Sequence, residues 1–272
     1  MTTQVVTSFS AAGWTQYGRR FVETFCRYWP REVALHAYSE DLNHRYLGDM
    51  LGRDLDRVCV CHDLQAPFFE RHAGNARAQG REQRSGDYGW TPNKIAAGYN
   101  FRLDAFRFSK KVFAIQAAAH RQAQGRLFWV DADVVTFDPV PADLLKRMLP
   151  SDAAISCLDR GDYHSECGFV GYNLDHSATR PFIDAFAALY ETENVFQLEQ
   201  WHDSWVFDWL RKKMNVAAYA IPHCSRKQPF VNSELGRVMD HLKGASKIKG
   251  KTLLKHMVAG HAHAYWSNGE RP

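Results

Sequence analysis

A short apolar segment that ends in two carboxylates constrains the fold of this chain more than any other feature. The segment Leu127-Phe128-Trp129-Val130 is aromatic and β-branched, and Asp131-Ala132-Asp133 follows it directly. Such a run predicts a buried strand of an α/β sheet. Because ligands of open α/β sheets bind at the carboxyl ends of the strands, we expect both carboxylates at the rim of a site. Carboxylates placed there favour Mg²⁺ or Mn²⁺, whereas an isolated Asp-x-Asp is also compatible with a solvated acidic turn.

Strand-like and helix-like segments alternate along the first half of the chain, and this alternation predicts a mostly parallel sheet with helices on both faces. The second half is more mixed, and no linker separates the halves. We therefore expect one domain over 1–272, with a nucleotide-binding half at about 1–138, an acceptor-side half at about 139–247 and a tail at 248–272. The expected strands are 5–9, 33–38, 58–61, 127–130, 153–158, 168–174 and 216–221, and the expected helices are 13–29, 104–124, 180–190 and 204–213. The Gly- and Arg-rich stretch 74–100 is long for a connection and predicts a functional loop or lid.

Composition and net charge limit the class of protein and the kinds of partner that the chain can have. The 272 residues are 45% hydrophobic and 24% charged, which is typical of a globular protein, and no apolar run reaches the length of a transmembrane helix. The six cysteines contain no CxxC pair and indicate reduced thiols in a cytoplasmic protein. A net charge of +4 suits a phosphate-bearing substrate or peripheral contact with an anionic membrane surface, and it is too small to indicate a nucleic-acid partner.

Several polar residues stand where a ligand would lie. Arg107 and Lys111 are four residues apart on a predicted helix, so they share a face from which two cations can neutralise a diphosphate; an exposed basic face is the alternative. Glu166 enters a strand that contains glycines, and glycine inside a strand often marks the close approach of a ligand or another backbone. Asp203 follows Trp201 and His202 and begins a helix, where Asp203 or Ser204 is expected either to cap the helix or to touch a sugar. Thr7 and Ser8, at the end of the first predicted strand, join this set as expected nucleotide contacts.

A second signal is His241-Leu242-Lys243-Gly244-Ala245-Ser246-Lys247. A neutral imidazole completes the coordination of Mn²⁺, which accepts mixed nitrogen and oxygen ligands. A lysine six residues after the histidine can reach phosphates that bridge to the metal. His256, His261 and His263 in the tail form a weaker, alternative metal-binding set.

Together these motifs resemble a GT-A glycosyltransferase. The stretch LFWVDADVVTFDP (127–139) is similar to the YLDADVLV..DP strand of glycogenin-like and bacterial lipopolysaccharide galactosyltransferases. His241 to Lys247 resembles their C-terminal HxxGxxKPW signature, except that Ile248-Lys249 replaces Pro-Trp. The segment Trp201-His202-Asp203 resembles the WHDE segment of the blood-group transferase type, with Ser204 in place of Glu.

The resemblance implies a UDP-sugar or related nucleotide-diphosphate sugar as donor. It also implies a metal held by Asp131, Asp133 and His241, with Lys247 on the diphosphate. The acceptor is expected to be a glycan, a lipid-linked sugar or a protein, and the expected role is in bacterial surface polysaccharide synthesis. Asp203 and Glu166 are the candidates for acceptor binding or base catalysis, which an inverting mechanism needs and a retaining one does not. A sugar nucleotidyltransferase and a non-catalytic nucleotide-sugar or glycan-binding protein are the alternative functions.

Overall fold

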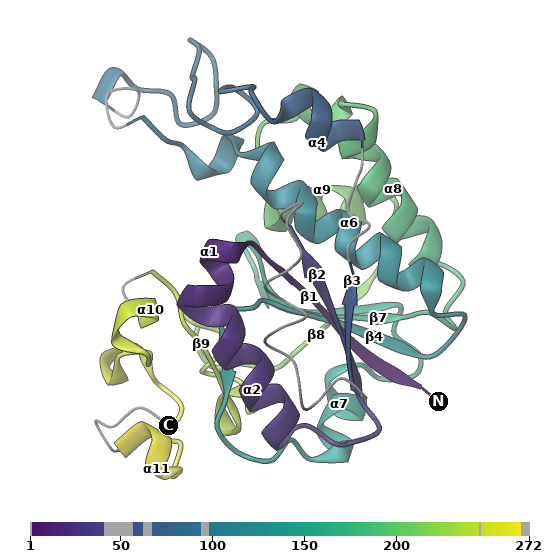
Figure 1. Cartoon of the computed structure of the whole chain (residues 1–272), viewed down its shortest axis with the longest axis vertical. Helices are drawn as coiled ribbons and strands as arrows, with labels where there is room; N and C mark the ends of the chain where they lie inside the picture. The colour runs from purple at the N-terminus through teal and green to yellow at the C-terminus, as the bar shows by residue number, and fades with distance from the viewer. Residues whose placement is uncertain (1, 41–56, 62–66, 94–97, 245, 268–272) are drawn as a thin grey trace.

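The central sheet confirms the predicted α/β class. The computed structural model describes residues 2–40, 57–61, 67–93, 98–244 and 246–267. Within these residues, seven strands form one sheet in the order β3-β2-β1-β4-β7-β6-β8 (Figure 1). The strands are β1 (Thr3–Phe9), β2 (Ala34–Ser39), β3 (Val58–Cys61), β4 (Arg126–Val130), β6 (Ile155–Arg160), β7 (Tyr163–Asn173) and β8 (Ala218–Ala220). The neighbours from β3 to β4 are parallel, whereas β7 runs antiparallel to both β4 and β6, so the sheet is mostly and not wholly parallel.

Helices cover both faces of this sheet, as predicted. One face carries α1 (Ala11–Gly13), a π-helical turn (Trp14–Gly18), α2 (Arg19–Tyr28) and α7 (Ala142–Met148); the other carries α6 (Ala105–Arg121), α8 (Thr179–Glu191) and α9 (Asp203–Lys213) (Figure 1). Successive strand residues point to opposite faces. In β4, Phe128 and Val130 therefore join the apolar core under α2 and α7, while Leu127 and Trp129 join the core under α6 and α8. The continuous apolar run is explained by this burial on both faces.

The predicted helices are present with shifted ends. The helix expected over 13–29 begins at Ala11 and includes the π-helical turn. The helix expected over 104–124 begins after Asp104, whose Oδ1 accepts the Arg107 backbone N–H at 2.9 Å and so caps it. The other helices among the described residues are short: α4 (Pro67–His72), α10 (Ser246–Lys249), α11 (Ala264–Ser267) and 3₁₀ turns at Phe101–Leu103, Asn194–Gln197, Glu234–Arg237 and Leu254–His256.

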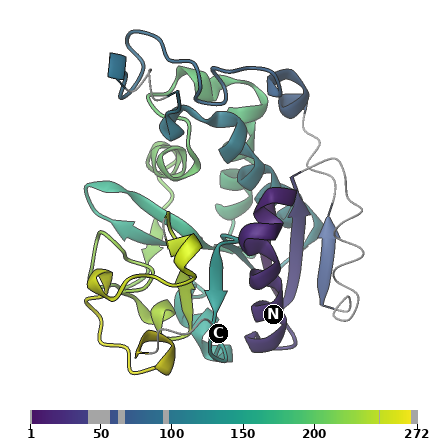
Figure 2. The ribbon, with the colours of Figure 1, turned by 60° about the vertical axis from the view of Figure 1, so that its left-hand side comes forward.

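A second, two-stranded sheet joins parts of the chain that are far apart in sequence. Strand β5 (Val134–Thr136) pairs antiparallel with β9 (Met239–His241), and Val134 lies directly opposite His241. Residues 246–267, which carry α10 and α11, pack beside β9 (Figures 1 and 2). There the buried carboxylate of Asp240 accepts hydrogen bonds from the Thr252 backbone N–H and the Tyr265 hydroxyl, both at 2.8 Å. These bonds hold the segment that follows His241 against the sheet.

The long connection expected over 74–100 has internal order in its described residues, 74–93 and 98–100. Arg77 and Asp87 form a bidentate ion pair with both N–O distances at 2.8 Å, and the Asn100 amide donates to the Tyr88 carbonyl. Residues 94–97 of this stretch, Ala245 of the His241–Lys247 motif and residues 268–272 of the tail lie outside the described residues. A lid function for this connection stays a prediction.

Two further expectations concern membranes and thiols. In the part of the chain that the structure describes, no helix combines the length and apolar character needed to cross a membrane. All six cysteines fall within that part, and each is a free thiol.

Candidate functional site

A cleft of about 1030 Å³ opens over the carboxyl ends of β1 and β4. The structure brings almost all of the predicted site residues to its wall: Ser8, Arg107, Lys111, Asp131, Asp133, Glu166, Asp203, His241 and Lys247. Thr7 is different, because it is completely buried within β1 and does not line the cleft. Ser8 does, and its hydroxyl donates to the Glu40 carboxylate at 2.8 Å.

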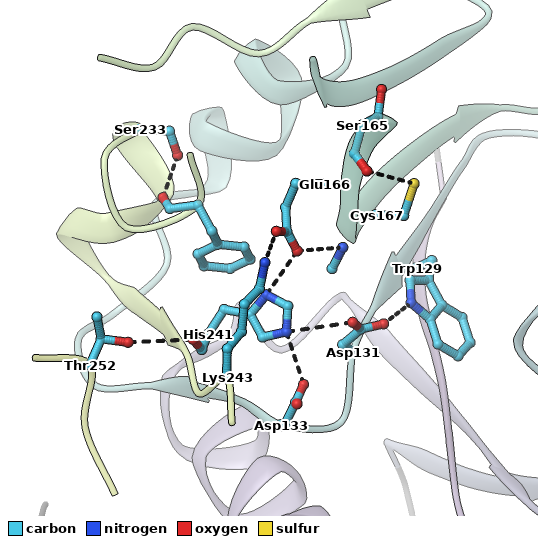
Figure 3. A network of polar contacts seen from close by, with 12 residues as sticks. Trp129, Asp131, Asp133, Ser165, Glu166, Cys167, Ser233, His241, Lys243 and Thr252 are labelled. Carbon is cyan, nitrogen blue, oxygen red and sulfur yellow. Dashed lines mark hydrogen bonds and ion pairs between the residues drawn. The ribbon is translucent and has the colours of Figure 1, made fainter. Parts of the chain in front are cut away.

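Two carboxylates and one imidazole meet at the floor of this cleft (Figure 3). His241 Nε2 lies 3.1 Å from Asp133 Oδ1 and 3.5 Å from Asp131 Oδ2. One ligand atom from each residue falls within 4.8 Å of the other two, and this is the one group of its kind among the described residues. Carboxylate oxygens with one imidazole nitrogen suit Mn²⁺ or Mg²⁺ better than a soft metal.

The local fold explains why these three residues converge. The Asp131 backbone N–H donates to the Gly168 carbonyl, and Val134 N–H closes a turn onto the Asp131 carbonyl, so the chain bends just after β4. The β5–β9 pairing then sets His241 beside this bend. A Cβ atom at Gly168 would lie only 2.3 Å from His241 Cε1. Glycine in β7 is therefore required for the imidazole to reach its place, as the sequence predicted for a close approach.

Ion pairs within the protein balance the charge of the triad carboxylates. Burial alone would raise the pKa of Asp133, but His241 and Lys247 outweigh it and hold the pKa of this carboxyl well below its usual range. Lys247 Nζ lies 2.8 Å from Asp133 Oδ2. Burial lowers the pKa of His241, while Asp133 and then Asp131 raise it, and the net shift is upward. A cation bound here would replace a proton and an ammonium as the partner of these carboxylates.

A buried lysine links the triad to the next carboxylate. Lys111 Nζ lies 3.2 Å from Asp131 Oδ1 and 2.8 Å from Asp203 Oδ2, and it donates to the Cys167 carbonyl at 2.5 Å. Burial opposes its charge, yet the two carboxylates raise its pKa above the ordinary value. Burial alone would raise the pKa of Asp203, but Lys111 acts in the opposite direction. The net shift is downward, so Asp203 is held ionised. Arg107, one helical turn earlier, also lines the cleft, and both predicted cations of α6 therefore face it.

Glu166 lies behind His241 as well as in the cleft wall (Figure 3). Its Oε1 is 3.2 Å from His241 Nδ1, and its Oε2 pairs with Lys243. A carboxylate this close to the second nitrogen of a ligand imidazole favours one orientation of the ring through its charge. These contacts favour a supporting role for Glu166; its predicted role as a base stays untested.

Asp203 is not the N-cap of its helix. His202 occupies the N-cap position of α9 and makes no side-chain capping hydrogen bond, while Asp203 is the first helical residue. Ser204, the other expected cap, follows it inside the helix. Neither residue therefore occupies the N-cap position, and the Asp203 carboxylate pairs with Lys111 and accepts the Ser204 backbone N–H.

Lys243, Trp129 and Tyr17 are among the cleft residues that were not predicted. Lys243 pairs with Glu166, Trp129 Nε1 donates to Asp131 Oδ1 at 2.5 Å, and the ring of Tyr17 lies 4.8 Å from Lys247 Nζ. Trp129 stands two residues before Asp131, and Lys243 two residues after His241. For Trp129 the period-two spacing of a strand was the available signal, because alternate residues lie on the same side. Lys243 lies beyond the end of β9, and no such signal was available for it.

The tail histidines do not form a second metal site. His261 Nε2 lies 2.7 Å from the Val231 carbonyl, and His263 Nε2 lies 3.8 Å from Asp138. Neither joins His256 in a group of metal-ligating atoms within the described residues.

The fold and the site define a class: an α/β protein with a candidate divalent-cation site at its strand ends, facing an open cleft. No protein-family model matches the chain, and no curated protein matches its sequence. The structure is similar to those of solved glycosyltransferases, and at these identities the likeness concerns the fold alone.

Three of these structures illustrate the similarity. Mouse xyloside xylosyltransferase 1, in its apo form, has a TM-score of 0.49 at 12% identity over 80% of this chain and 84% of that one. The apo form of the glycosyltransferase GlyE from Streptococcus pneumoniae has a TM-score of 0.49 at 10% identity over 80% of this chain and 45% of that one. The galactosyltransferase LgtC, in complex with donor and acceptor sugar analogs, has a TM-score of 0.45 at 10% identity over 76% of this chain and 70% of that one.

Proposed function

We propose that this protein is a metal-dependent glycosyltransferase that moves a sugar from a nucleotide-diphosphate sugar to an acceptor hydroxyl. The observation that carries the proposal is the convergence of Asp131, Asp133 and His241 at the strand ends, beside the buried Lys111–Asp203 ion pair. Oxygen ligands with one imidazole fit Mn²⁺, with Mg²⁺ as the second choice. The cleft has the size of a site for a small-molecule ligand.

The residues around the triad suit an anionic donor. Lys247 and Arg107 lie on the cleft wall, where they can contact a diphosphate, and Ser8 and Glu40 stand at the ends of β1 and β2, where a ribose is expected. A divalent cation, when bound to the triad, supplies Lewis-acid stabilisation of the leaving diphosphate. Glu166 holds the His241 ring in place from behind.

Asp203 is the residue we assign to the reacting sugar. Because Lys111 holds its pKa below the ordinary value, its carboxylate is a weak base and a permanent negative charge. Such a group stabilises positive charge that develops at the sugar carbon better than it accepts a proton from the acceptor. The anomeric configuration of the product, retained or inverted, tests this assignment. We propose no catalytic base other than Asp203 and Glu166.

The test is turnover of donor. The protein is incubated with Mn²⁺ and a panel of UDP-, GDP- and dTDP-sugars, and release of the nucleoside diphosphate is measured. We expect release from at least one donor, its loss with EDTA, and a fall of about a hundredfold or more in Asp203→Asn. Asp184→Asn, a half-exposed carboxylate on α8, is the matched control and should keep full activity.

Other outcomes separate the alternatives. Pyrophosphate release from a nucleoside triphosphate and a sugar 1-phosphate, without donor turnover, would identify a nucleotidyltransferase. Metal-dependent binding of the donors without any turnover would identify a binding protein. Either result contradicts the proposal. A cytoplasmic location and a role in surface polysaccharide synthesis are parts of the proposal, and the six free thiols support the first.

A further inference from the structure

Four aromatic rings gather on the wall of the cleft beside Asp203, and the proposed chemistry at the triad does not use them. We call Phe101, Phe108, His164 and His202 the aromatic platform. They come from the 3₁₀ turn Phe101–Leu103, from α6, from β7 and from the N-cap of α9, and all four line the cleft.

The rings form one connected surface with His202 at its centre. The His202 ring centroid lies 4.7 Å from that of His164, 5.6 Å from that of Phe101 and 5.8 Å from that of Phe108. His202 is buried, whereas Phe101 remains 43% exposed. The Arg102 guanidinium lies over the Phe101 ring, 5.1 Å from its centroid, so a ligand stacks on the ring face that Arg102 leaves open.

The two imidazoles add hydrogen-bonding groups without charge. Burial lowers the pKa of His202 to about 4 and also lowers the pKa of His164, so both rings are neutral at physiological pH. A neutral imidazole carries one donor and one acceptor, which matches a sugar hydroxyl. His202 uses Nε2 toward Gln200 at 3.0 Å. Within the described residues, neither ring nitrogen of His164 has a protein hydrogen-bond partner, so both are available to a ligand.

The platform lies next to Asp203, which connects it to the triad. His202 directly precedes Asp203, and Asp203 connects through Lys111 to Asp131. A ligand that rests on the platform therefore presents its edge to the same carboxylate that we assign to the reacting sugar.

Building on the proposed function, we propose that the aromatic platform is the acceptor subsite and that it binds a pyranose residue of a glycan. The apolar face of the ring stacks on Phe101 and Phe108, one hydroxyl bonds to His164, and the accepting hydroxyl points toward Asp203. The apolar face of a pyranose fits such a ring surface, and its hydroxyl edge fits the neutral imidazoles, so we favour a sugar; a peptide ligand is the alternative that the test separates.

The test measures glycoside binding separately from donor chemistry. Saturation-transfer NMR is recorded with UDP and Mg²⁺ present, because Mg²⁺ is diamagnetic and does not broaden the ligand signals. The probes are methyl β-glycosides of glucose, galactose, xylose and N-acetylglucosamine, and a Ser/Thr-rich peptide. We expect saturation of at least one glycoside, and a loss of affinity on the order of tenfold in Phe101→Ala, where the stacking surface is removed. His164→Phe keeps the ring and removes its nitrogens, so it should weaken the same glycoside less. Circular dichroism of each variant confirms that it is folded, and its UDP affinity is measured separately.

Tyr163→Ala is the matched control. Tyr163 neighbours His164 on β7, is 63% exposed and does not line the cleft, so its removal should leave glycoside binding unchanged. Saturation of the peptide alone, saturation of no probe, or equal glycoside affinity in Phe101→Ala and wild type would overturn the acceptor assignment. Glycoside binding that depends on Phe101 in a protein that does not bind UDP would instead refute the proposed function and keep the platform as a glycan-binding site.

Discussion

Replacing Lys111 with methionine should strongly destabilise the protein, because Lys111 is the buried cation that two carboxylates share. Its Nζ lies 2.8 Å from Asp203 and 3.2 Å from Asp131, and both Lys111 and Asp203 are buried. Methionine fills a similar volume, so the cost is electrostatic. At an effective dielectric constant of about 20, each contact corresponds to about 5 to 6 kcal/mol of Coulomb attraction, from which the cost of desolvation must be subtracted. Removing one partner of a buried pair typically costs about 3–5 kcal/mol, and we expect that loss in the free energy of unfolding at pH 7.5.

The loss should depend on pH. In the wild type, the lowered pKa of Asp203 contributes stability above the pKa of the unfolded chain, and this stability disappears only as the pH falls through the folded value. Without Lys111, burial makes the folded pKa higher than the unfolded one. Folding then takes up a proton, and the variant recovers stability as the pH falls from neutrality toward about 4.

Urea unfolding at pH 7.5 and pH 5 measures both effects. Arg19→Met removes an exposed helix cation, 2.8 Å from Glu23, and is the control; it should cost at most about 0.5 kcal/mol. A loss below about 1 kcal/mol in Lys111→Met at pH 7.5, or an equal loss at both pH values, would refute the reasoning.

Two further predictions concern the neighbouring positions. Gly168→Ala places a Cβ atom 2.3 Å from His241 Cε1, so the imidazole must move. The affinity for Mn²⁺, measured by electron paramagnetic resonance, should therefore fall about tenfold or more. Gly74→Ala is the control, because its Cβ meets no atom within 4 Å. Unchanged affinity in Gly168→Ala would show that His241 is not a ligand. His202→Gln should flatten the pH dependence of stability. Burial lowers the folded pKa of His202 to about 4, so the unfolded chain takes up the proton first as the pH falls. In urea unfolding, the free energy of unfolding of the wild type should therefore fall by about 2 kcal/mol more than that of the variant between pH 7 and pH 5. Parallel losses in the two proteins would contradict the shift.

The local elements of the fold could be predicted because they depend on nearby residues. The apolar run 127–130 predicted a buried strand; β4 confirms it and is buried on both faces. The direction of β7 could not be read from its sequence, because a buried strand has the same pattern whether it is parallel or antiparallel to its neighbours. The three-residue strands β5 and β9 are too short to give a periodic signal, yet their pairing is what brings His241 beside Asp133.

The residue types of the site were predictable, whereas the partners within it were not. Asp131, Asp133 and His241 could be grouped because the metal chemistry of carboxylates and imidazole is selective. Lys111 was expected to face a diphosphate, but it lies buried between two carboxylates from distant segments, which only the tertiary fold places opposite it. The same limit applied to Glu166, whose pairing with Lys243 requires β7 and the residues after β9 to meet.

The most direct test of the central claim is calorimetric titration of UDP into the protein with and without Mn²⁺, in the wild type and in Asp133→Ala. We expect binding that requires Mn²⁺ in the wild type and is lost in Asp133→Ala, while circular dichroism shows the variant still folded. Asp184→Asn should bind as the wild type does. Mn²⁺-dependent UDP affinity that is unchanged in Asp133→Ala would contradict a metal site formed by Asp131, Asp133 and His241.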